Sequence, residues 1–405
     1  MNKRKIINDP VHGFIHIPTE LIFDIISHPF FQRLRRITQL GLTSFVYPGA
    51  LHTRLHHALG AMHLMGVALD TLRTKGHHIS DEEKEAAQIA ILLHDIGHSP
   101  FSHALEHTIL QNVPHESMSL LLMQKLNQEF QNRLSLAIDI FMGKYERAFF
   151  HQLVSSQLDI DRLDYLQRDC FFTGVSEGTI GADRILKMLD IVDNQIVVEE
   201  KGIYSIENFL TARRLMYWQV YLHKTTISTE QMIVQLIKRA RFLVQNGETV
   251  FASPALMLFM QNTVVLEDFE KNERYLNAFA NLDDYDIWGA IKIWVTNQDK
   301  ILSTLARMLL DRKLFKVMLS DEKVETEVLQ NIKTKVKNQY QLKENELDYF
   351  FVKGATKNTA YETKNDQILI LTKKRGILDI TEASDLPTIK ALTKIVKKYY
   401  VCWAR

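Results

Sequence analysis

The spacing of apolar residues changes along this chain of 405 residues. Residues 5–20 alternate apolar and polar positions around Asp-Pro and His-Gly turn signals, which predicts a short β-hairpin. From about 29 to 158 the apolar residues recur every three or four positions, which is the period of amphipathic helices. The helical period continues through 160–190. This part of the chain therefore predicts a helical body preceded by one hairpin.

The second half of the chain mixes both periods. Residues 194–206 predict a hairpin and residues 207–246 a long helix, while 252–339 read as shorter helices. Residues 347–380 are β-rich with Gly and Asn turns between the apolar runs, and a lysine-rich amphipathic segment covers about 387–400. Strands that follow a long helical stretch are typical of an α+β lobe.

We therefore predict a mainly α protein in three parts: an N-terminal hairpin segment (1–50), a helical core (51–310) and a smaller C-terminal α+β lobe (311–405). No run of 18 apolar residues is present and the N-terminus lacks the apolar stretch of a signal peptide, so we expect no membrane partner. The two cysteines, Cys170 and Cys402, form no disulfide framework, which favours a cytoplasmic location.

Charge and histidine content are unevenly distributed. The net charge of +1 does not indicate a nucleic-acid partner. Residues 311–405 nevertheless hold 19 lysines and arginines against 13 acids, which fits either a solvated face or a site for an anionic ligand. Of the 16 histidines, 14 lie in residues 1–115. Because a buried neutral histidine needs a hydrogen-bond partner or a metal, this crowding indicates where the chemistry lies.

The dipeptide His94-Asp95, within I-L-L-H-D-I-G-H-S-P-F-S-H, is the strongest candidate for metal binding. Adjacent residues on a helix point about 100° apart, so both can bind one ion only at a helix end, which Gly97 and Pro100 supply. We expect Asp161 and one histidine of the pair His56-His57 to complete the site; chemistry alone does not choose between these two histidines. Two imidazoles and two carboxylates suit Mn, Fe(II), Mg or Co better than structural zinc.

Several motifs carry a resemblance to a known family: N-D-P-V-H-G, Q-R-L-R-R-I-T-Q-L-G, Y-P-G-A-L-H-T-R-L-H-H-A-L-G, L-L-H-D-I-G-H-S-P-F-S-H, L-D-I-D-R-L-D-Y-L-Q-R-D-C and Y-L-H-K. Over residues 5–224 the chain resembles the HD superfamily of metal-dependent phosphohydrolases. More narrowly, it is similar to the deoxynucleoside triphosphate (dNTP) triphosphohydrolases, including bacterial members and the animal SAM-and-HD-domain enzyme. The resemblance implies an HD-domain helical core and the metal ligands His57, His94, Asp95 and Asp161.

Acid–base chemistry needs a group that protonates the leaving 5′-oxygen, and His98, His103 and the His115-Glu116 pair follow the H-D turn. The resemblance gives His115 the role of general acid, oriented by Glu116 and by Glu106, which replaces a shorter Asp of the animal enzyme. It places His103 at the scissile phosphate. The hairpin residue His12 is expected to serve its turn rather than chemistry.

The resemblance also implies the substrate contacts. The phosphate channel would be lined by Arg54, Arg162, Tyr165, Arg213 and His223. Gln39 and Asp169 would hold the 3′-hydroxyl, Tyr165 would exclude ribose, and Leu40, Tyr217 and Tyr221 would border the base. Relatives bind nucleotide effectors at a subunit interface, where Lys5, Gln32 and Arg35 match; Ser27 stands where the guanine-reading Asp would be.

The sequence thus predicts a homo-oligomeric dNTP triphosphohydrolase, dimer or tetramer, that releases a deoxynucleoside and tripolyphosphate. One divalent ion would occupy the HD site, a second would come with substrate, and a nucleotide would act as activator. Two alternatives stay open at this point. One is an HD-type phosphatase or phosphodiesterase that acts on another nucleotide. The other is a non-catalytic regulator that binds nucleotides or nucleic acid.

Overall fold

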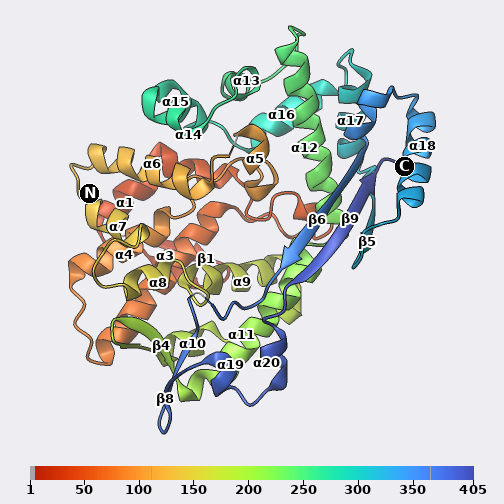
Figure 1. The fold of residues 1–405 in the computed structure, drawn as a ribbon. Helices are drawn as coiled ribbons and strands as arrows, with labels where there is room; N and C mark the ends of the chain where they lie inside the picture. Colours follow the sequence, from red (N-terminus) through yellow and green to blue (C-terminus); the bar gives the residue numbers. More distant parts are fainter. Residues whose placement is uncertain (1–4, 111, 365) are drawn as a thin grey trace.

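The computed structural model describes residues 5–110, 112–364 and 366–405 as a mainly helical protein (Figure 1). Residues 1–4 of the predicted N-terminal segment lie outside this described part. The predicted N-terminal hairpin is confirmed: β1 (Ile6–Asp9) pairs antiparallel with β2 (Gly13–His16). Helices α1 (Glu20–Ser27) and α2 (Pro29–Gln32) follow it and lead into the helical body.

Three helices position the metal-binding motifs: α3 (Arg54–Thr74), α4 (Asp81–Leu93) and α9 (Ile160–Thr173). A capping box at Ser80 begins α4, because Ser80 Oγ accepts from Glu83 N at 3.1 Å and Glu83 Oε2 accepts from Ser80 N at 2.7 Å. The helices between α4 and α9 are α5 (Glu106–Ile109), α6 (His115–Glu129), α7 (Ser135–Phe141) and α8 (Phe149–Val154), and α10 (Ala182–Met188) follows α9.

The predicted helix over 207–246 is wrong as one element. The structure has α11 (Ile203–Met216), a π-helical turn η6 (Tyr217–Tyr221) and then α12 (Lys224–Gln245), which His223 caps. The hairpin predicted over 194–206 lies earlier, as β3 (Leu189–Val192) and β4 (Gln195–Glu199). The apolar period runs on through the π turn, so the sequence pattern does not reveal it, and such turns often occur at functional sites.

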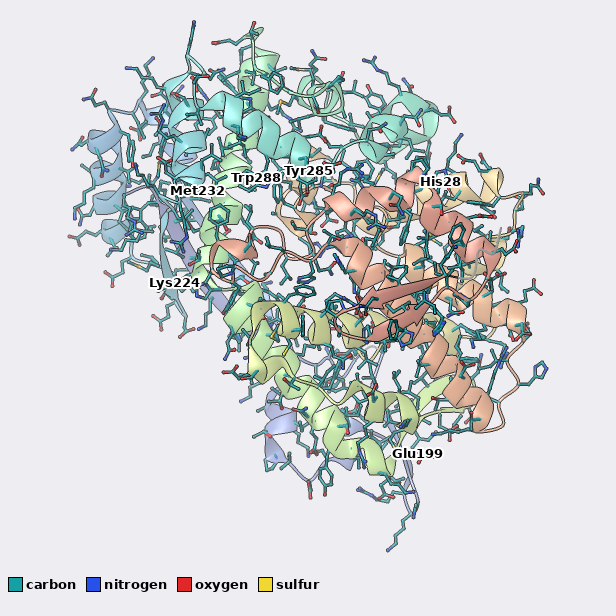
Figure 2. All side chains as sticks on the ribbon, turned by 180° about the vertical axis from the view of Figure 1, so that it is seen from behind. His28, Glu199, Lys224, Met232, Tyr285 and Trp288 are labelled. Atoms are coloured by element: carbon teal, nitrogen blue, oxygen red, sulfur yellow. The ribbon has the colours of Figure 1, made fainter. Side chains whose placement is uncertain are left out.

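Residues 254–310 form shorter helices, as predicted: α13 (Pro254–Gln261), α14 (Leu266–Lys271), α15 (Glu273–Ala280), α16 (Asp284–Trp294) and α17 (Lys300–Leu310). The prediction of helices up to residue 339 is wrong in one place, because a strand, β5 (Lys316–Ser320), comes before α18 (Thr326–Tyr340). Figure 2 shows side chains filling the space between the ribbons, with Met232 and Lys224 along α12 and Trp288 and Tyr285 on α16. Met232 and Trp294 are among the fully buried core residues. No helix in the described ranges is long and apolar enough to cross a membrane.

The strands of residues 311–405 belong to two different sheets. One is antiparallel in the order β5 (Lys316–Ser320), β9 (Val396–Trp403) and β6 (Phe351–Asn358). The other extends the β3–β4 hairpin, because β7 (Leu369–Thr372) pairs parallel with β4 and antiparallel with β8 (Gly376–Asp379). This segment is therefore not one independent unit, since its second sheet is shared with residues 189–199 of the core.

The lysine-rich segment at 387–400 also differs from a single amphipathic element. It contains a one-turn helix, α20 (Pro387–Ala391), and then most of β9, after the short α19 (Ile380–Ala383). Strand β9 is the central strand of its sheet, and Val401 and Cys402 in its C-terminal half are buried. Figure 1 shows this sheet beside α12, with α18 on its outer side.

Candidate active site

The end of α4 places His94 and Asp95 against α3 and α9. His57 Nε2 lies 3.1 Å from Asp161 Oδ1, and His94 Nε2 lies 3.4 Å from the same oxygen. Asp95 faces both imidazoles, with Oδ1 3.3 Å from His94 Nε2 and Oδ2 3.7 Å from His57 Nε2. Ligands about 2.1 Å from an ion and at right angles to one another lie about 3 Å apart, so the spacing suits one divalent metal.

Hydrogen bonds on the far side of each imidazole fix which nitrogen faces this centre. His57 Nδ1 lies 2.7 Å from Asp164 Oδ2, and His94 Nδ1 lies 2.6 Å from the carbonyl oxygen of Ile91. Both Nδ1 atoms face pure acceptors and therefore carry hydrogen. The Nε2 atoms then point at the centre, where both are buried and have no hydrogen-bond partner among the described residues. Buried nitrogens in this state, together with carboxylates, fit a metal ion that takes the place of the Nε2 proton.

The charges at the centre favour ionised carboxylates. Burial raises the pKa of Asp95, but Arg54 and then His94 and His57 outweigh it and hold this pKa at about 2. Arg54 also donates from Nη1 to Asp95 Oδ2 and from Nε to Ser102 Oγ at 2.8 Å. Asp159 stands apart from the ligands, because it caps α9 by accepting from Arg162 N at 2.7 Å.

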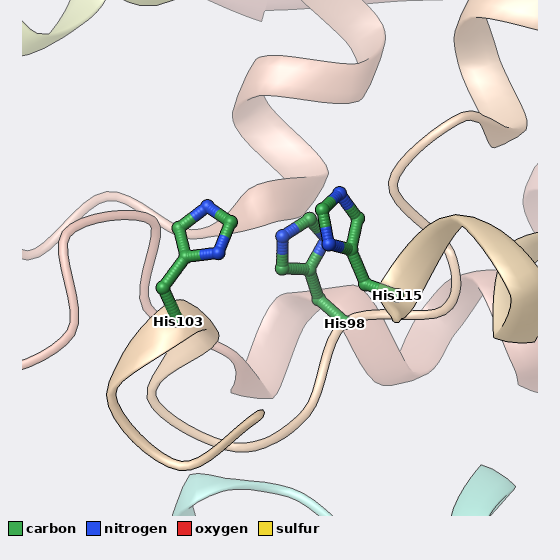
Figure 3. Close-up of side chains that lie close together, drawn as sticks. All are labelled: His98, His103 and His115. Atoms are coloured by element: carbon green, nitrogen blue, oxygen red, sulfur yellow. The ribbon is translucent and has the colours of Figure 1, made fainter. Parts of the chain in front are cut away.

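A second cluster of imidazoles lies beside this centre and contains His98, His103 and His115 (Figure 3). The ring centroids of His98 and His115 are 3.9 Å apart, and His103 lies 5.0 Å from His98 and 5.3 Å from His115. Gly97 makes this packing possible, since a Cβ there would lie 2.3 Å from the carbonyl oxygen of His115. The absence of a side chain at Gly97 lets the first turn of α6 approach the H-D turn.

Glu106 links two of these histidines. Its Oε1 accepts from His115 N and from His115 Nδ1, both at 2.8 Å, and its Oε2 lies 3.0 Å from His103 Nδ1. Burial raises the pKa of Glu106, but the hydrogen bonds from His103 and His115 outweigh it, so the carboxyl is ionised. The longer side chain of Glu106 therefore reaches His115, while Glu116 is 63% exposed and lies 3.5 Å from His115 Nδ1.

His98 differs from its neighbours in charge. It is buried, and burial followed by the charge of Arg54 holds the pKa of His98 well below its ordinary value. Its ring is therefore neutral near pH 7 and is not a cationic acid. His98 Nε2 has no hydrogen-bond partner in the part of the chain that the structure describes, so it offers one hydrogen-bonding atom to a ligand in the site.

Two arginines, one on α9 and one on α11, have buried side-chain nitrogens that form no hydrogen bond with any described residue. Arg213 is 8% exposed, and these nitrogens are its Nε and Nη1. Arg162 pairs through Nη1 with Asp159, and its nitrogen of this kind is Nε. Burial raises the pKa of the Tyr165 hydroxyl, and the charges of Arg162 and Arg213 both act on it, which places the two cations around one tyrosine.

The residues predicted to hold sugar and base are joined by contacts. Tyr221 donates to Asp169 Oδ2 at 2.7 Å, and the Tyr221 ring lies 6.2 Å from Tyr165 and 5.2 Å from Tyr217. Tyr217 and Tyr221 begin and end the π turn η6. Gln39 has a buried Oε1 without a partner, and Leu40 packs on the core. The π turn thus places the rings of Tyr217 and Tyr221 next to each other and near Tyr165.

The remaining predicted residues are His223 and the candidate effector residues. His223 caps α12 by accepting from Thr225 N at 3.1 Å. Of the predicted effector residues, Arg35 donates to Gln32 Oε1 at 2.7 Å, whereas Lys5 is exposed just before β1. Ser27 is exposed at the end of α1.

Sequence reasoning missed the residues behind the site. His52 Nε2 lies 2.8 Å from Asp169 Oδ1, and Asp164 binds His57 from behind. His12, which is expected to serve its turn, also reaches beyond the hairpin, because its Nε2 lies 2.6 Å from Asp164 Oδ1. Asp164 was visible only as one acid of the L-D-I-D-R-L-D-Y cluster, and no local pattern pairs it with the hairpin.

Comparisons with known proteins cover the part of the chain that carries this site. The sequence profile of the HD domain matches residues 54–169, and that of an HD-associated region matches residues 180–252. The uncharacterised protein YwfO of Bacillus subtilis is 34% identical over 326 residues, which cover 78% of this chain and 72% of that protein. A crystal structure of a phosphohydrolase from Bacteroides thetaiotaomicron has a TM-score of 0.96 at 52% identity and covers 99% of this chain and 100% of that chain.

Two relatives carry a more specific name, deoxynucleoside triphosphate triphosphohydrolase. The SAMHD1 homolog of Dictyostelium discoideum is 31% identical over 323 residues, which cover 73% of this chain and 62% of that protein. Human SAMHD1 is 28% identical over 281 residues, which cover 58% of this chain and 44% of that protein. The chain thus matches about half to two thirds of these two relatives.

Proposed function

Because the chain belongs to the HD-domain metal-dependent phosphohydrolases, the family of the dNTP triphosphohydrolases, we propose that it hydrolyses dNTPs at the α-phosphate. The products are a deoxynucleoside and tripolyphosphate. The observation that carries this proposal is the pair Arg162 and Arg213, whose charges act on one tyrosine, Tyr165, and whose buried nitrogens have no partner among the described residues. Arg162 directly follows the metal ligand Asp161 in the chain. A triphosphate supplies the negative charge that such guanidinium groups bind.

His57, His94, Asp95 and Asp161 would hold the metal. When bound, a divalent ion supplies Lewis acidity toward the α-phosphate and an activated water. Arg54 keeps Asp95 ionised and turned toward the two imidazoles. Asp164 and the Ile91 carbonyl hold hydrogen on the Nδ1 atoms, which leaves both Nε2 atoms free to bind.

His115 is the general acid of this proposal. Glu106 accepts hydrogen from His115 Nδ1, so the second proton of the imidazolium is carried on Nε2 and is transferred to the leaving 5′-oxygen. The same carboxylate holds His103, which is exposed and free to meet the scissile phosphate. The neutral His98, whose ring is packed against that of His115, contributes a hydrogen bond rather than a proton.

Arg162 and Arg213 bind the phosphates, and Tyr165 stands between them and the sugar. Asp169, oriented by His52 and Tyr221, accepts from the 3′-hydroxyl together with Gln39. The 2′ position of ribose would place an extra hydroxyl against Tyr165, which selects deoxyribose. The base is bordered by Leu40, Tyr217 and Tyr221. His223 ends the phosphate channel. Our candidates for an effector site are Lys5, Gln32 and Arg35.

The test is turnover of each dNTP, alone and mixed, by metal-stripped protein to which Mn, Mg, Fe(II) or Co is added, with the products separated. We expect deoxynucleoside and tripolyphosphate from dNTPs and much slower turnover of ribonucleotides. Turnover of mixtures where single nucleotides fail would indicate a nucleotide activator. Release of pyrophosphate or orthophosphate would favour a different HD-type phosphatase, and no turnover with any metal would favour a non-catalytic nucleotide-binding regulator.

A further inference from the structure

The turn of the N-terminal hairpin reaches a metal ligand through one buried carboxylate. His12 Nε2 lies 2.6 Å from Asp164 Oδ1, and Asp164 Oδ2 lies 2.7 Å from His57 Nδ1. The His12 side chain is 7% exposed and those of Asp164 and His57 are fully buried. A residue 45 positions before His57 in the chain therefore stands two hydrogen bonds away from it.

Arg168 completes the hydrogen bonding of Asp164. Its Nε donates to Asp164 Oδ2 and its Nη2 to Asp164 Oδ1, both at 2.9 Å. With the donors of His12 and His57, each carboxylate oxygen accepts two hydrogen bonds. A carboxylate has about four lone-pair sites, so Asp164 is saturated and cannot rotate without losing a partner.

Asp9 connects this network back to the hairpin. Arg168 donates from Nη1 to Asp9 Oδ2 at 2.8 Å. The other oxygen of Asp9 accepts from the backbone nitrogens of Val11 at 3.0 Å and His12 at 2.9 Å. Asp9 therefore fixes both the guanidinium that holds Asp164 and the turn that carries His12.

The helix that carries His57 is shaped to receive the same network. A Cβ on Gly60, one turn after His57, would lie 2.0 Å from Asp164 Oδ1 and 2.1 Å from Arg168 Nη2. Only glycine leaves room there for the carboxylate and the guanidinium to lie against α3. Three separate segments, the hairpin, α3 and α9, thus pack around the side of the His57 ring that carries Nδ1.

We propose that His12 and Asp9 are positioning residues for the metal ligand His57, acting through Asp164 and Arg168, and that the hairpin is part of the metal site. The proposal rests on the metal site of the proposed function. An oriented acceptor keeps hydrogen on His57 Nδ1 and aims the Nε2 lone pair, and partners of this kind usually change metal affinity about 10- to 100-fold when lost. Metal affinity consequently depends on whether the hairpin is docked.

The experiment measures the Mn²⁺ dissociation constant of the full-length, metal-stripped protein by titration calorimetry, without nucleotide. His12→Phe keeps a ring but removes the donor, whereas His12→Gln keeps an N–H at the Nε2 position. His16→Phe is the matched control, because His16 is an exposed histidine of the same hairpin. His57→Ala gives the Mn²⁺ affinity of a site that has lost the metal ligand His57. The melting temperature of each stripped protein separates loss of fold from loss of positioning.

We expect His12→Phe to weaken Mn²⁺ binding about 10- to 100-fold, His12→Gln to recover most of that loss and His16→Phe to match the parent. Should His12→Phe unfold the protein, Asp9→Asn takes its place, with the same loss of affinity expected. Parent-like affinity in a folded His12→Phe protein, alongside a strong loss in His57→Ala, would overturn the role of the hairpin alone. Parent-like affinity in His57→Ala would instead overturn the metal site on which the proposal rests.

Discussion

Replacing Glu106 with glutamine tests the assignment of the general acid. Glu106 accepts two hydrogen bonds from His115, at its backbone nitrogen and at Nδ1, and one from His103. A glutamine side chain has one acceptor oxygen and one donor NH₂ group. If its oxygen keeps the hydrogen bonds from His115, its NH₂ group must face His103 in place of the second carboxylate oxygen. The charge that stabilises the imidazolium of His115 is lost in either orientation.

The expected magnitude follows from that lost charge. A hydrogen bond to an ionised group contributes about 1.5–3 kcal/mol, which corresponds to about a 10- to 100-fold fall in kcat. The whole contribution of a general acid is about 10²- to 10⁴-fold, so Glu106→Gln should remove part of it and His115→Ala more. Since Glu106 is buried and ionised, Glu106→Gln should also lower the melting temperature at neutral pH.

The assay compares two leaving groups. With a dNTP the departing 5′-oxygen needs a proton, whereas p-nitrophenyl triphosphate releases a stable phenolate that needs none. Glu106→Gln should therefore slow dNTP hydrolysis strongly and p-nitrophenyl triphosphate hydrolysis only slightly. Equal losses on both substrates would refute the assignment of His115 as an acid held by Glu106, as would an unchanged kcat on dNTPs.

Three further predictions concern the metal ligands and the phosphate-binding cations. Asp161→Asn should abolish turnover and weaken Mn²⁺ binding in calorimetry; full activity in that protein would mean that the ligand is misassigned. Burial alone would lower the pKa of His57, but Asp161 and Asp164 raise it to about 10, so a metal must displace a proton there. Mn²⁺ affinity should therefore rise with pH, by about tenfold per unit between about pH 6 and 9, and a pH-independent affinity would contradict this. Arg213→Gln should raise KM for dNTPs about 10- to 100-fold with little change in melting temperature, since Arg213 Nε and Nη1 have no protein partner to lose; an unchanged KM would remove Arg213 from the phosphate site.

The position of the H-D pair was predictable, because residues close to it in the sequence mark the start and the end of its helix. Ser80 and Glu83 define the start of α4, and the glycine and proline after Asp95 define its end, so the place of the H-D pair followed from sequence. The sequence favours Asp161 as a ligand among the three acids Asp159, Asp161 and Asp164, and the family resemblance names the same residue. In the structure Asp159 caps α9 and Asp164 lies behind His57, and only the packing of α9 on α3 separates these roles.

The parts that the sequence did not predict depend on long-range contacts. The contact of His12 with Asp164 joins residues 152 positions apart. The parallel pairing of β4 with β7 joins Val197 to Leu369, and no periodicity encodes a partner at that distance. The π turn at Tyr217–Tyr221 keeps an apolar helical pattern, so only the structure shows that it gathers two tyrosines beside Tyr165.

The position of bond cleavage tests the central claim most directly. The purified protein is incubated with a dNTP and Mn²⁺ in ¹⁸O-labelled water, and the products are examined by mass spectrometry. Attack at the α-phosphorus with departure of the 5′-oxygen predicts an unlabelled deoxynucleoside and intact tripolyphosphate that carries one ¹⁸O. Deoxynucleoside monophosphate with pyrophosphate, or diphosphate with orthophosphate, would contradict the proposed function.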